Sequence, residues 1–236
     1  MVLLKIAEVV FGVIPKYDLT VKICRDYVYN GAEKPAFIAE ISEDDIKKVA
    51  GEIENCSLGY AESLEVFRAL CDYVLDKGDG IIFHCSAVAV DGEAYLFAAP
   101  SGTGKSTHTR FWRELLGDKA VMINDDKPII KYVDGAFYVY GTPWMGKHRL
   151  GANTRAKIKA ICKLERGAKN AIEKASAGEM LITVFNQTLR PTSEDGVNKL
   201  LDLTDKLLKS VALYKLECTP DIAAAQLSYN VMSKGE

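Results

Sequence analysis

The segment 99–106 has residue types and spacing that suit the binding of nucleotide phosphates. It reads Ala-Pro-Ser-Gly-Thr-Gly-Lys-Ser, which matches the pattern G-x-x-x-x-G-K-S/T except that Ala99 replaces the first glycine. Gly102 and Gly104 let backbone N–H groups turn toward an anion. Lys105 would place its charge on the β- and γ-phosphates, and the Ser106 hydroxyl would ligate Mg²⁺.

The context of this loop favours a phosphate site over a purely structural turn, which is the alternative for small residues before a helix. An apolar segment that is expected to form a strand precedes the loop, and a segment with helical character follows it. The positive end of that helix dipole would face the same phosphates. The nucleotide-binding residues predicted from this pattern are Ser101, Gly102, Thr103, Gly104, Lys105, Ser106 and Thr107.

Two adjacent carboxylates, Asp125 and Asp126, follow the apolar segment 120–123, which is predicted to form a strand. One carboxylate could bind Mg²⁺ together with Ser106, and the other could take a proton from an attacking hydroxyl group. We expect Asp125 to be the base, and both aspartates are candidate metal ligands. Because neighbouring side chains of a strand point to opposite faces, both reach one site only if the strand ends between them. The alternative is a solvated turn after a strand.

His84 lies in the apolar segment 80–90, which the two-residue turn Asp91-Gly92 connects to the strand that enters the loop. Pairing of these strands would bring the imidazole near the phosphates, where it could orient an aspartate or shift the pKa of that carboxyl group. A structural, hydrogen-bonded histidine is the alternative. His108 and His148 are weaker candidates for a role in the chemistry.

The basic segment 141–157 is the best source of a cation that would stabilise charge during phosphoryl transfer. Arg149 and Arg155 are the candidates, and Arg190 is a weaker one. A solvated basic loop is the alternative. Trp144 could anchor this loop or stack on an acceptor.

The elements that must position these residues predict an α/β fold with a mixed sheet, inserted hairpins and flanking helices. The turns Asp91-Gly92 and Asp134-Gly135 predict two hairpins. Thr219 is the predicted N-cap of the last helix and Pro220 its first residue. The predicted segments from residue 58 onward are helix 60–78, strands 80–90 and 94–99, helix 106–117, strands 120–123, 127–133, 136–140 and 157–167, helices 176–189 and 193–210, strand 211–218 and helix 219–232.

Residues 1–57 are predicted to form short strands at 2–14, 19–24 and 36–41. They would make a small β-rich subdomain or an extension of the same sheet, and residues 58–236 would form the catalytic domain.

The composition of the 236-residue chain is that of an ordinary globular protein, with 48% hydrophobic residues and a net charge of −2. There is no basic excess to indicate binding of nucleic acid or of an anionic membrane, and no apolar run long enough to span a bilayer. The six cysteines lack the spacing of metal ligands, so reduced thiols and a cytoplasmic location are expected. The oligomeric state stays open, a homo-oligomer included.

Taken together, these residues resemble the catalytic domain of HPr kinase/phosphorylase and the related fold of phosphoenolpyruvate carboxykinase. In the former family a histidine stands 21 positions before the loop lysine, as His84 stands before Lys105, and an aspartate pair follows the next strand, as Asp125 and Asp126 do. The resemblance covers residues 80–130 with good motifs and is looser beyond them. It implies a P-loop kinase fold, ATP and Mg²⁺ as cofactors, and an aspartate as the base.

The predicted function is therefore an ATP- and Mg²⁺-dependent kinase with a hydroxyl acceptor. The resemblance favours a serine of a protein or peptide, because compact relatives phosphorylate serines on small ribosomally made peptides. The family's later glycine-rich signature has no recognisable counterpart here, which argues against HPr itself as the substrate. A small-molecule alcohol kinase and a nucleotide-binding regulatory module without turnover are the alternatives, and the donor could also be GTP or pyrophosphate.

Overall fold

The chain forms two units in the computed structural model, which describes residues 1–236 except 78, 192 and 236. The units comprise Met1–Val74 and Leu75–Glu236, so the division falls inside helix α3 (Leu58–Lys77). The predicted division between residues 57 and 58 lies directly before this helix, where the predicted N-terminal strands end and a new helical pattern begins. The predicted stop of this helix at Gly78 lies outside the described residues.

The first unit contains a three-stranded sheet. Strands β1 (Val2–Ile6) and β2 (Val9–Val13) form an antiparallel hairpin, and both residues of its turn, Ala7 and Glu8, have positive φ. Strand β3 (Ile38–Ala39) pairs in parallel with β2. The predicted strand 2–14 is therefore a two-stranded hairpin, and 36–41 contributes only two strand residues.

The prediction of a strand at residues 19–24 is wrong, because this segment forms helix α1 (Asp18–Ile23), followed by the short helix η1 (Arg25–Tyr27). The reason is a long-range contact. The buried carboxylate of Glu62 on α3 accepts hydrogen bonds from the backbone N–H groups of Lys16, at 2.6 Å, and Tyr17, at 3.1 Å. It thus holds the start of α1, where N–H groups have no partner within the helix.

Helix α2 (Glu43–Glu52) was not predicted, although its start carries a local signal. The Ser42 side chain caps it by accepting a hydrogen bond from the backbone N–H of Asp45 at 3.1 Å. Three acidic residues in the first turn suit the positive end of the helix dipole.

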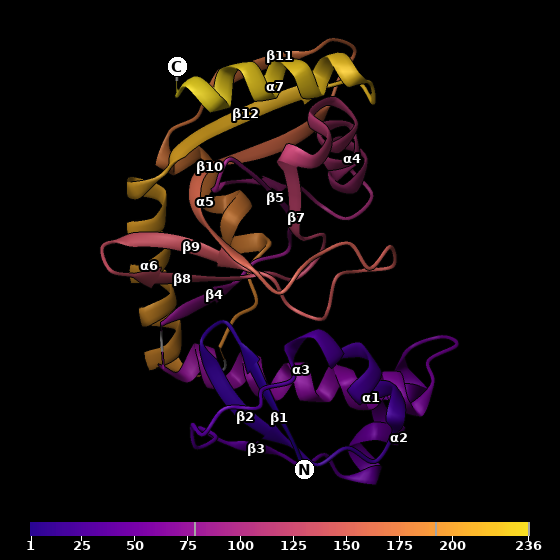
Figure 1. The fold of residues 1–236 in the computed structure, drawn as a ribbon. Helices are drawn as coiled ribbons and strands as arrows, with labels where there is room; N and C mark the ends of the chain where they lie inside the picture. Colours follow the sequence, from indigo (N-terminus) through magenta and orange to yellow (C-terminus); the bar gives the residue numbers. More distant parts are fainter. Residues whose placement is uncertain (78, 192, 236) are drawn as a thin grey trace. The chain divides into compact units, whose positions relative to one another are not determined.

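The second unit is built on a mixed sheet, whose strand order is β4-β8-β9-β10-β6-β5-β7, with β12 also paired to β10 and β11 to β12 (Figure 1). The long strand β10 runs antiparallel to β9 and parallel to β6 and β12. The strands are β4 (Gly80–Ile82), β5 (Cys85–Val90), β6 (Glu93–Ala98), β7 (Ala120–Asn124), β8 (Ile129–Val133), β9 (Ala136–Tyr140), β10 (Arg155–Arg166), β11 (Ala171–Lys174) and β12 (Ala212–Cys218). The helices are α4 (Lys105–Leu116), η2 (Gly117–Lys119), α5 (Ala177–Asn186), α6 (Glu194–Ser210) and α7 (Ile222–Lys234).

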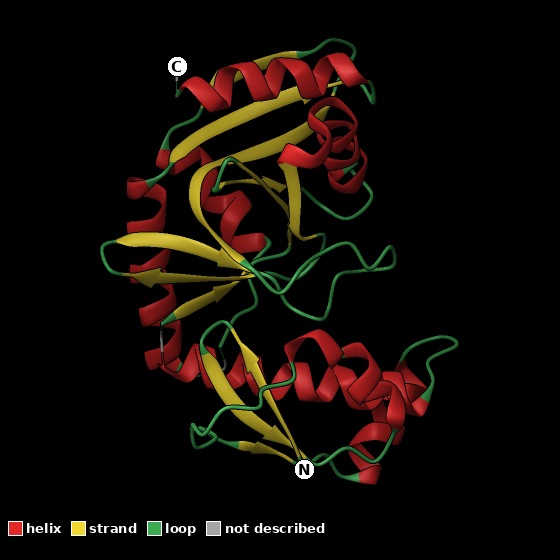
Figure 2. Ribbon diagram, in the orientation of Figure 1, coloured by secondary structure: helices red, strands yellow, loops and turns green. Residues whose placement is uncertain are grey.

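Helices cover both faces of this sheet, as Figure 2 shows. Alternate residues of a strand point to opposite faces. Accordingly, Ala87 of β5 belongs to an apolar cluster with α5 and α6, and Val88 belongs to a second cluster with α4 and α7. The fully buried Trp112 lies in the second cluster and donates a hydrogen bond of 2.9 Å to the Ser228 hydroxyl. The predicted mixed α/β fold is confirmed at this level.

The predictions for strand 80–90 and for the start of the last helix need correction. The expected strand 80–90 is two strands, because the chain leaves the ladder at 83–84, where the His84 N–H donates to the Gln187 carbonyl at 2.7 Å. The last helix is capped by Asp221, which accepts from the Ala224 N–H at 3.0 Å, and not by Thr219. The Thr219 hydroxyl instead donates to the Asp221 carboxylate, so Pro220 precedes the helix. Strand β11 was not predicted.

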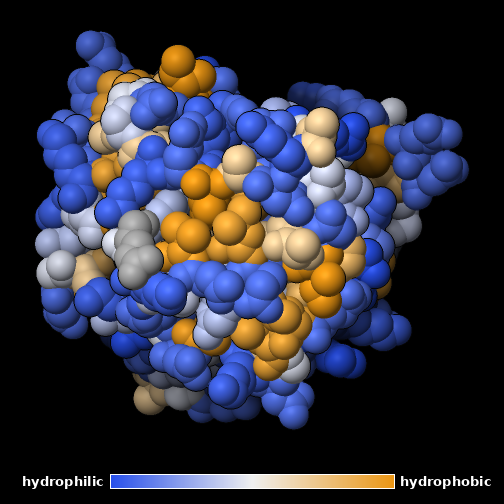
Figure 3. All heavy atoms as spheres, turned by 90° about the horizontal axis from the view of Figure 1, so that it is seen from above, coloured by the Kyte–Doolittle hydropathy of each residue, from blue (hydrophilic) through white to orange (hydrophobic). Residues whose placement is uncertain are grey.

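The surface viewed from above Figure 1, where α7 lies, carries hydrophobic side chains in its middle with hydrophilic ones around them (Figure 3). Within the described part of the chain, none of the helices combines the length and the apolar character that crossing a bilayer requires.

Candidate functional site

Three chain segments meet at one edge of the second unit's sheet. Strand β5 runs antiparallel to both β6 and β7, so the carboxyl ends of β6 and β7 lie at the same edge as the start of β5. The register pairs Cys85 with Ala98 and Ala87 with Asn124. The residues just beyond these positions are His84, the loop after Ala98 and the aspartate pair, and they therefore emerge side by side.

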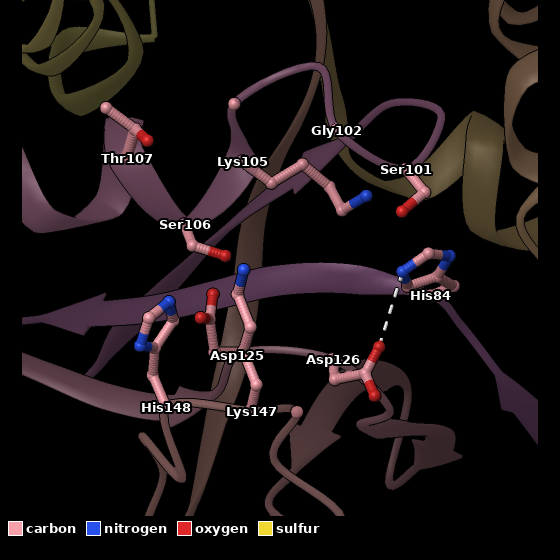
Figure 4. A pocket seen from close by; sticks show the side chains of 12 residues that line it. His84, Ser101, Gly102, Lys105, Ser106, Thr107, Asp125, Asp126, Lys147 and His148 are labelled. Carbon is pink, nitrogen blue, oxygen red and sulfur yellow. Dashed lines mark ion pairs between the residues drawn. The ribbon is translucent and has the colours of Figure 1, made fainter. Parts of the chain in front are cut away.

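These segments surround a cavity of about 490 Å³ (Figure 4). The loop, the aspartate pair, His84 and part of the basic segment 141–157 all contribute to its wall. The lining residues are His84, Ser101, Gly102, Gly104, Lys105, Ser106, Thr107, Asp125, Asp126, Gly146, Lys147 and His148.

The loop has the backbone conformation that its glycines allow. Gly102 has φ of 77° and Gly104 has φ of 121°, both in the region that residues with a Cβ rarely adopt. Helix α4 starts directly after Gly104, and no side chain caps its N-terminus. Ala99 is buried and its φ is not positive, so the methyl group that replaces the first glycine of the pattern fits without strain.

The Lys105 side chain lies inside the cavity wall and is only 7% exposed. Its Nζ donates a hydrogen bond of 2.7 Å to the Ala99 carbonyl. Burial lowers the pKa of Lys105, while Cys85 and the two nearby aspartates act in the opposite direction. A phosphate beside this ammonium group would supply an anionic partner and favour its charged form.

Asp125 is held from behind by a buried pair of hydroxyl groups. The Ser86 hydroxyl donates to Asp125 Oδ1 at 2.6 Å, and the Thr109 hydroxyl lies 2.9 Å from the Ser86 oxygen. Asp125 itself is 8% exposed. Figure 4 shows its carboxylate and the Ser106 hydroxyl at the same end of the cavity. This end therefore offers two oxygen ligands of the kind that Mg²⁺ prefers.

Asp126 lies at the other end of the cavity, beside His84. Its Oδ1 is 3.3 Å from His84 Nε2, and its Oδ2 accepts a hydrogen bond of 2.9 Å from Lys127 Nζ. Burial and the Lys105 ammonium group lower the pKa of His84, and Asp126 partly opposes them. The imidazole is therefore more readily neutral at pH 7 than an exposed histidine.

Asn124 orders the turn that carries both aspartates. Its Oδ1 accepts hydrogen bonds from the backbone N–H groups of Asp126, at 2.8 Å, and Lys127, at 2.7 Å. Its Nδ2 donates to the Thr142 carbonyl at 3.0 Å. This fully buried amide thus ends strand β7 in a tight turn, which lets two consecutive aspartates line one cavity.

The basic segment contributes other residues than those predicted. Lys147 and His148 line the cavity, whereas Arg149 and Arg155 do not. The Arg155 guanidinium donates to the Tyr140 hydroxyl at 2.8 Å and lies over the ring of Tyr138. It begins strand β10, so the sheet and not the loop fixes its direction.

The remaining candidates have structural surroundings. His108 is buried, its Nε2 lies 3.0 Å from the Ser228 hydroxyl, and burial lowers its pKa to about 4. Arg190 lies over the ring of Phe185. Trp144 is buried. Thr103 lines a second cavity and not the first.

Sequence reasoning missed Ser86, Asn124, Gly146 and Lys147. Gly146 has φ of 69°, and a Cβ there would lie 3.2 Å from the Cβ of Asp126. The only signals for these residues are the sequence Asn-Asp-Asp and a glycine before a lysine in the basic segment. Neither signal is specific, because the contacts that place these residues at the site join segments 18 or more residues apart.

The site suits a metal ion that a substrate brings with it. Among the described residues, no group of three or more histidine, cysteine, aspartate or glutamate side chains could hold a metal. Magnesium is commonly held by one or two protein oxygens together with phosphates and water. The Ser106 hydroxyl and the Asp125 carboxylate fit that requirement.

Comparison with known proteins gives a structural likeness and no assignment. No family model matches the chain, and no curated protein matches it. Among solved structures, the chain is similar to the Hpr(Ser) kinase/phosphatase from Coxiella burnetii, with a TM-score of 0.36 and 8% identity, over 64% of this chain and 94% of that chain.

Proposed function

We propose that this protein is a kinase that transfers the terminal phosphoryl group of ATP to a hydroxyl group with the help of Mg²⁺. The observation that carries the proposal is the meeting of a glycine loop, a buried lysine and two differently held carboxylates in one cavity. A structural turn would have no need of a buried ammonium group or of paired aspartates facing it.

The loop and the start of α4 bind the phosphates in this proposal. Backbone N–H groups at residues 101–106 and the Lys105 ammonium group neutralise the phosphate oxygens. Ser106 and Asp125 would hold Mg²⁺, and the ion would supply positive charge to offset the negative charge that develops on the phosphates. Ser86 fixes one oxygen of Asp125, so the other oxygen can turn toward the metal.

Asp126 acts as the base, which exchanges the roles first expected for the two aspartates. Asp126 lies beside His84 at the end of the cavity away from Ser106. Asp125 lies near Ser106 and is more deeply buried. Asp126 takes the proton of the acceptor hydroxyl as that oxygen bonds to the terminal phosphorus. The bond between this phosphorus and the bridging oxygen breaks, and ADP leaves. His84 orients the Asp126 carboxylate.

Lys147 and His148 take the place of the predicted arginines. They line the cavity beside Asp125 in Figure 4, where the Lys147 ammonium group can stabilise negative charge on the phosphates and His148 can donate a hydrogen bond to them. A serine of a protein or peptide is the proposed acceptor, on the resemblance of the motifs alone.

The test measures ATP binding first and phosphoryl transfer second. Binding of Mg²⁺-ATP is measured by calorimetry, and transfer by release of ADP and labelling of serine peptides and small alcohols with γ-³²P-ATP. Lys105→Met is expected to lose ATP binding and phosphoryl transfer. Lys119→Met, on the short helix after α4, is expected to keep both. Failure of the wild-type protein to bind Mg²⁺-ATP would refute the proposal. Binding without transfer to any acceptor or water would favour the regulatory module.

A further inference from the structure

We infer that a second cavity, next to the phosphate-binding loop, holds the nucleoside of the bound nucleotide; this inference rests on the proposed function. The cavity measures about 400 Å³ and shares Gly102, Gly104 and Thr107 with the first cavity. The remaining wall comes from α4, from the ends of β10 and β12, and from the chain after β12. Its other lining residues are Thr103, His108, Phe111, Leu164, Arg166, Gly167, Cys218, Thr219 and Pro220.

The direction in which a nucleotide would lie along the loop supports this location. Asp126 and His84 mark the end of the first cavity where the terminal phosphate reacts. A triphosphate that lies along the loop must then direct its other end, with ribose and base, away from these groups. The second cavity begins at the loop glycines and continues along α4 to Phe111, one turn beyond Thr107. It is thus in reach of the α-phosphate.

The chemistry of the wall suits a base more than another phosphate or a metal. Phe111, Leu164 and Pro220 supply apolar surface, and the Arg110 guanidinium lies 4.7 Å from the centre of the Phe111 ring. None of the described lining residues is an aspartate or glutamate. Aromatic rings stack on nucleic acid bases regardless of which base is present.

Arg166 ties this cavity to the loop. Its Nε donates to the Thr103 carbonyl at 3.3 Å and its Nη2 to the Gly102 carbonyl. In a trans peptide the N–H points opposite to the carbonyl, so the Gly104 N–H points away from Arg166. Arg166 therefore holds the carbonyl groups of Gly102 and Thr103 on the side of the loop that faces β10. The same side chain lines the second cavity.

The first experiment compares two probes, Mg²⁺-ATP and Mg²⁺-tripolyphosphate, which share a phosphate chain but not a nucleoside. For Phe111→Ala, calorimetry should show a loss of ATP affinity of about tenfold or more, and tripolyphosphate affinity within about twofold of wild type. Lys119→Ala, at an exposed position of the short helix after α4, is the control and should change neither.

The second experiment needs no change in the cavity. Cys218 lines it and is partly exposed, and Cys56 is the other partly exposed cysteine of the chain. In a Cys56→Ser background, the rate of Cys218 alkylation at mildly alkaline pH should fall at least several-fold with saturating Mg²⁺-ATP. Saturating Mg²⁺-tripolyphosphate should leave the rate nearly unchanged.

The outcomes separate this inference from the proposed function. If ATP binds to the wild-type protein but Phe111→Ala binds it equally well and ATP does not protect Cys218, the nucleoside lies elsewhere and the kinase proposal stands. Equal protection by both probes would likewise overturn the nucleoside assignment. If neither probe binds, the kinase proposal fails and this inference fails with it.

Discussion

At the scale of single residues, the two adjacent aspartates differ in what holds them. Asp125 is fixed by the Ser86 hydroxyl in the interior, and Asp126 by His84 and Lys127 at the cavity wall. A carboxylate that is held rigidly beside a hydroxyl group suits the role of a metal ligand. A carboxylate at the cavity wall beside an imidazole suits a group that receives a proton.

Exchange of each carboxylate for an amide should therefore have different effects. Asp126→Asn should lower the rate constant of transfer by about 10²–10⁴-fold, because the base is lost, and leave Mg²⁺-ATP affinity nearly unchanged. Asp125→Asn should lose most of the Mg²⁺-dependent part of ATP affinity. Single-turnover transfer and calorimetry with and without Mg²⁺ measure both effects. The reverse pattern would restore Asp125 as the base.

Ser86 offers a test of positioning. Ser86→Ala should raise the Mg²⁺ concentration needed for half-maximal activity, because Asp125 loses the hydrogen bond that orients it. Thr109→Ser keeps the hydroxyl group that contacts Ser86 and serves as the control. An unchanged Mg²⁺ dependence, with stability alone reduced, would show that Ser86 is only a core residue.

At the scale of elements, the turn after β7 determines whether both aspartates can face the cavity. A continuing strand would turn Asp125 and Asp126 to opposite faces. The Asn124 side chain prevents this by binding the N–H groups of Asp126 and Lys127 and by anchoring the turn to the segment at Thr142.

Asn124→Ala should destabilise the protein by about 1–3 kcal/mol, since two partly buried backbone N–H groups lose their acceptor. Transfer should fall further than the loss of folded protein explains, because both carboxylates lose their placement. Urea unfolding and the activity per folded molecule are the measurements. Asn186→Ala, at the exposed end of α5, should be close to wild type in both. An active, destabilised Asn124→Ala protein would contradict the positioning role.

Local sequence patterns were sufficient to predict most helices and strands of the second unit, but few of those of the first. Helix α4 and the hairpins at Asp91-Gly92 and Asp134-Gly135 follow from a periodic apolar face and two-residue turns. Helix α1 does not, because the Glu62 carboxylate that holds its start comes from a distant helix.

At the scale of the whole molecule, ligand binding and stability are linked. A ligand that binds only the folded protein stabilises it by about 2.7 kcal/mol at 100 times its dissociation constant. Saturating Mg²⁺-ATP should therefore raise the unfolding temperature of the second unit by ~5–10 °C. Differential scanning calorimetry with and without EDTA tests this shift. Lys105→Met should show little of it, and a shift that survives in this variant would place the nucleotide elsewhere.

The sequence alone determined the residues of the loop and so the prediction of its chemistry. Two glycines, a lysine and a serine between a strand and a helix predict a phosphate site, because backbone freedom and charge are properties of the residues. It could not decide which carboxylate faces which partner, nor that Lys147 and not Arg155 reaches the cavity. Those facts depend on strand register and on the buried contacts of Ser86 and Asn124, which join residues far apart in the chain. Only the tertiary structure brings such residues within hydrogen-bonding distance.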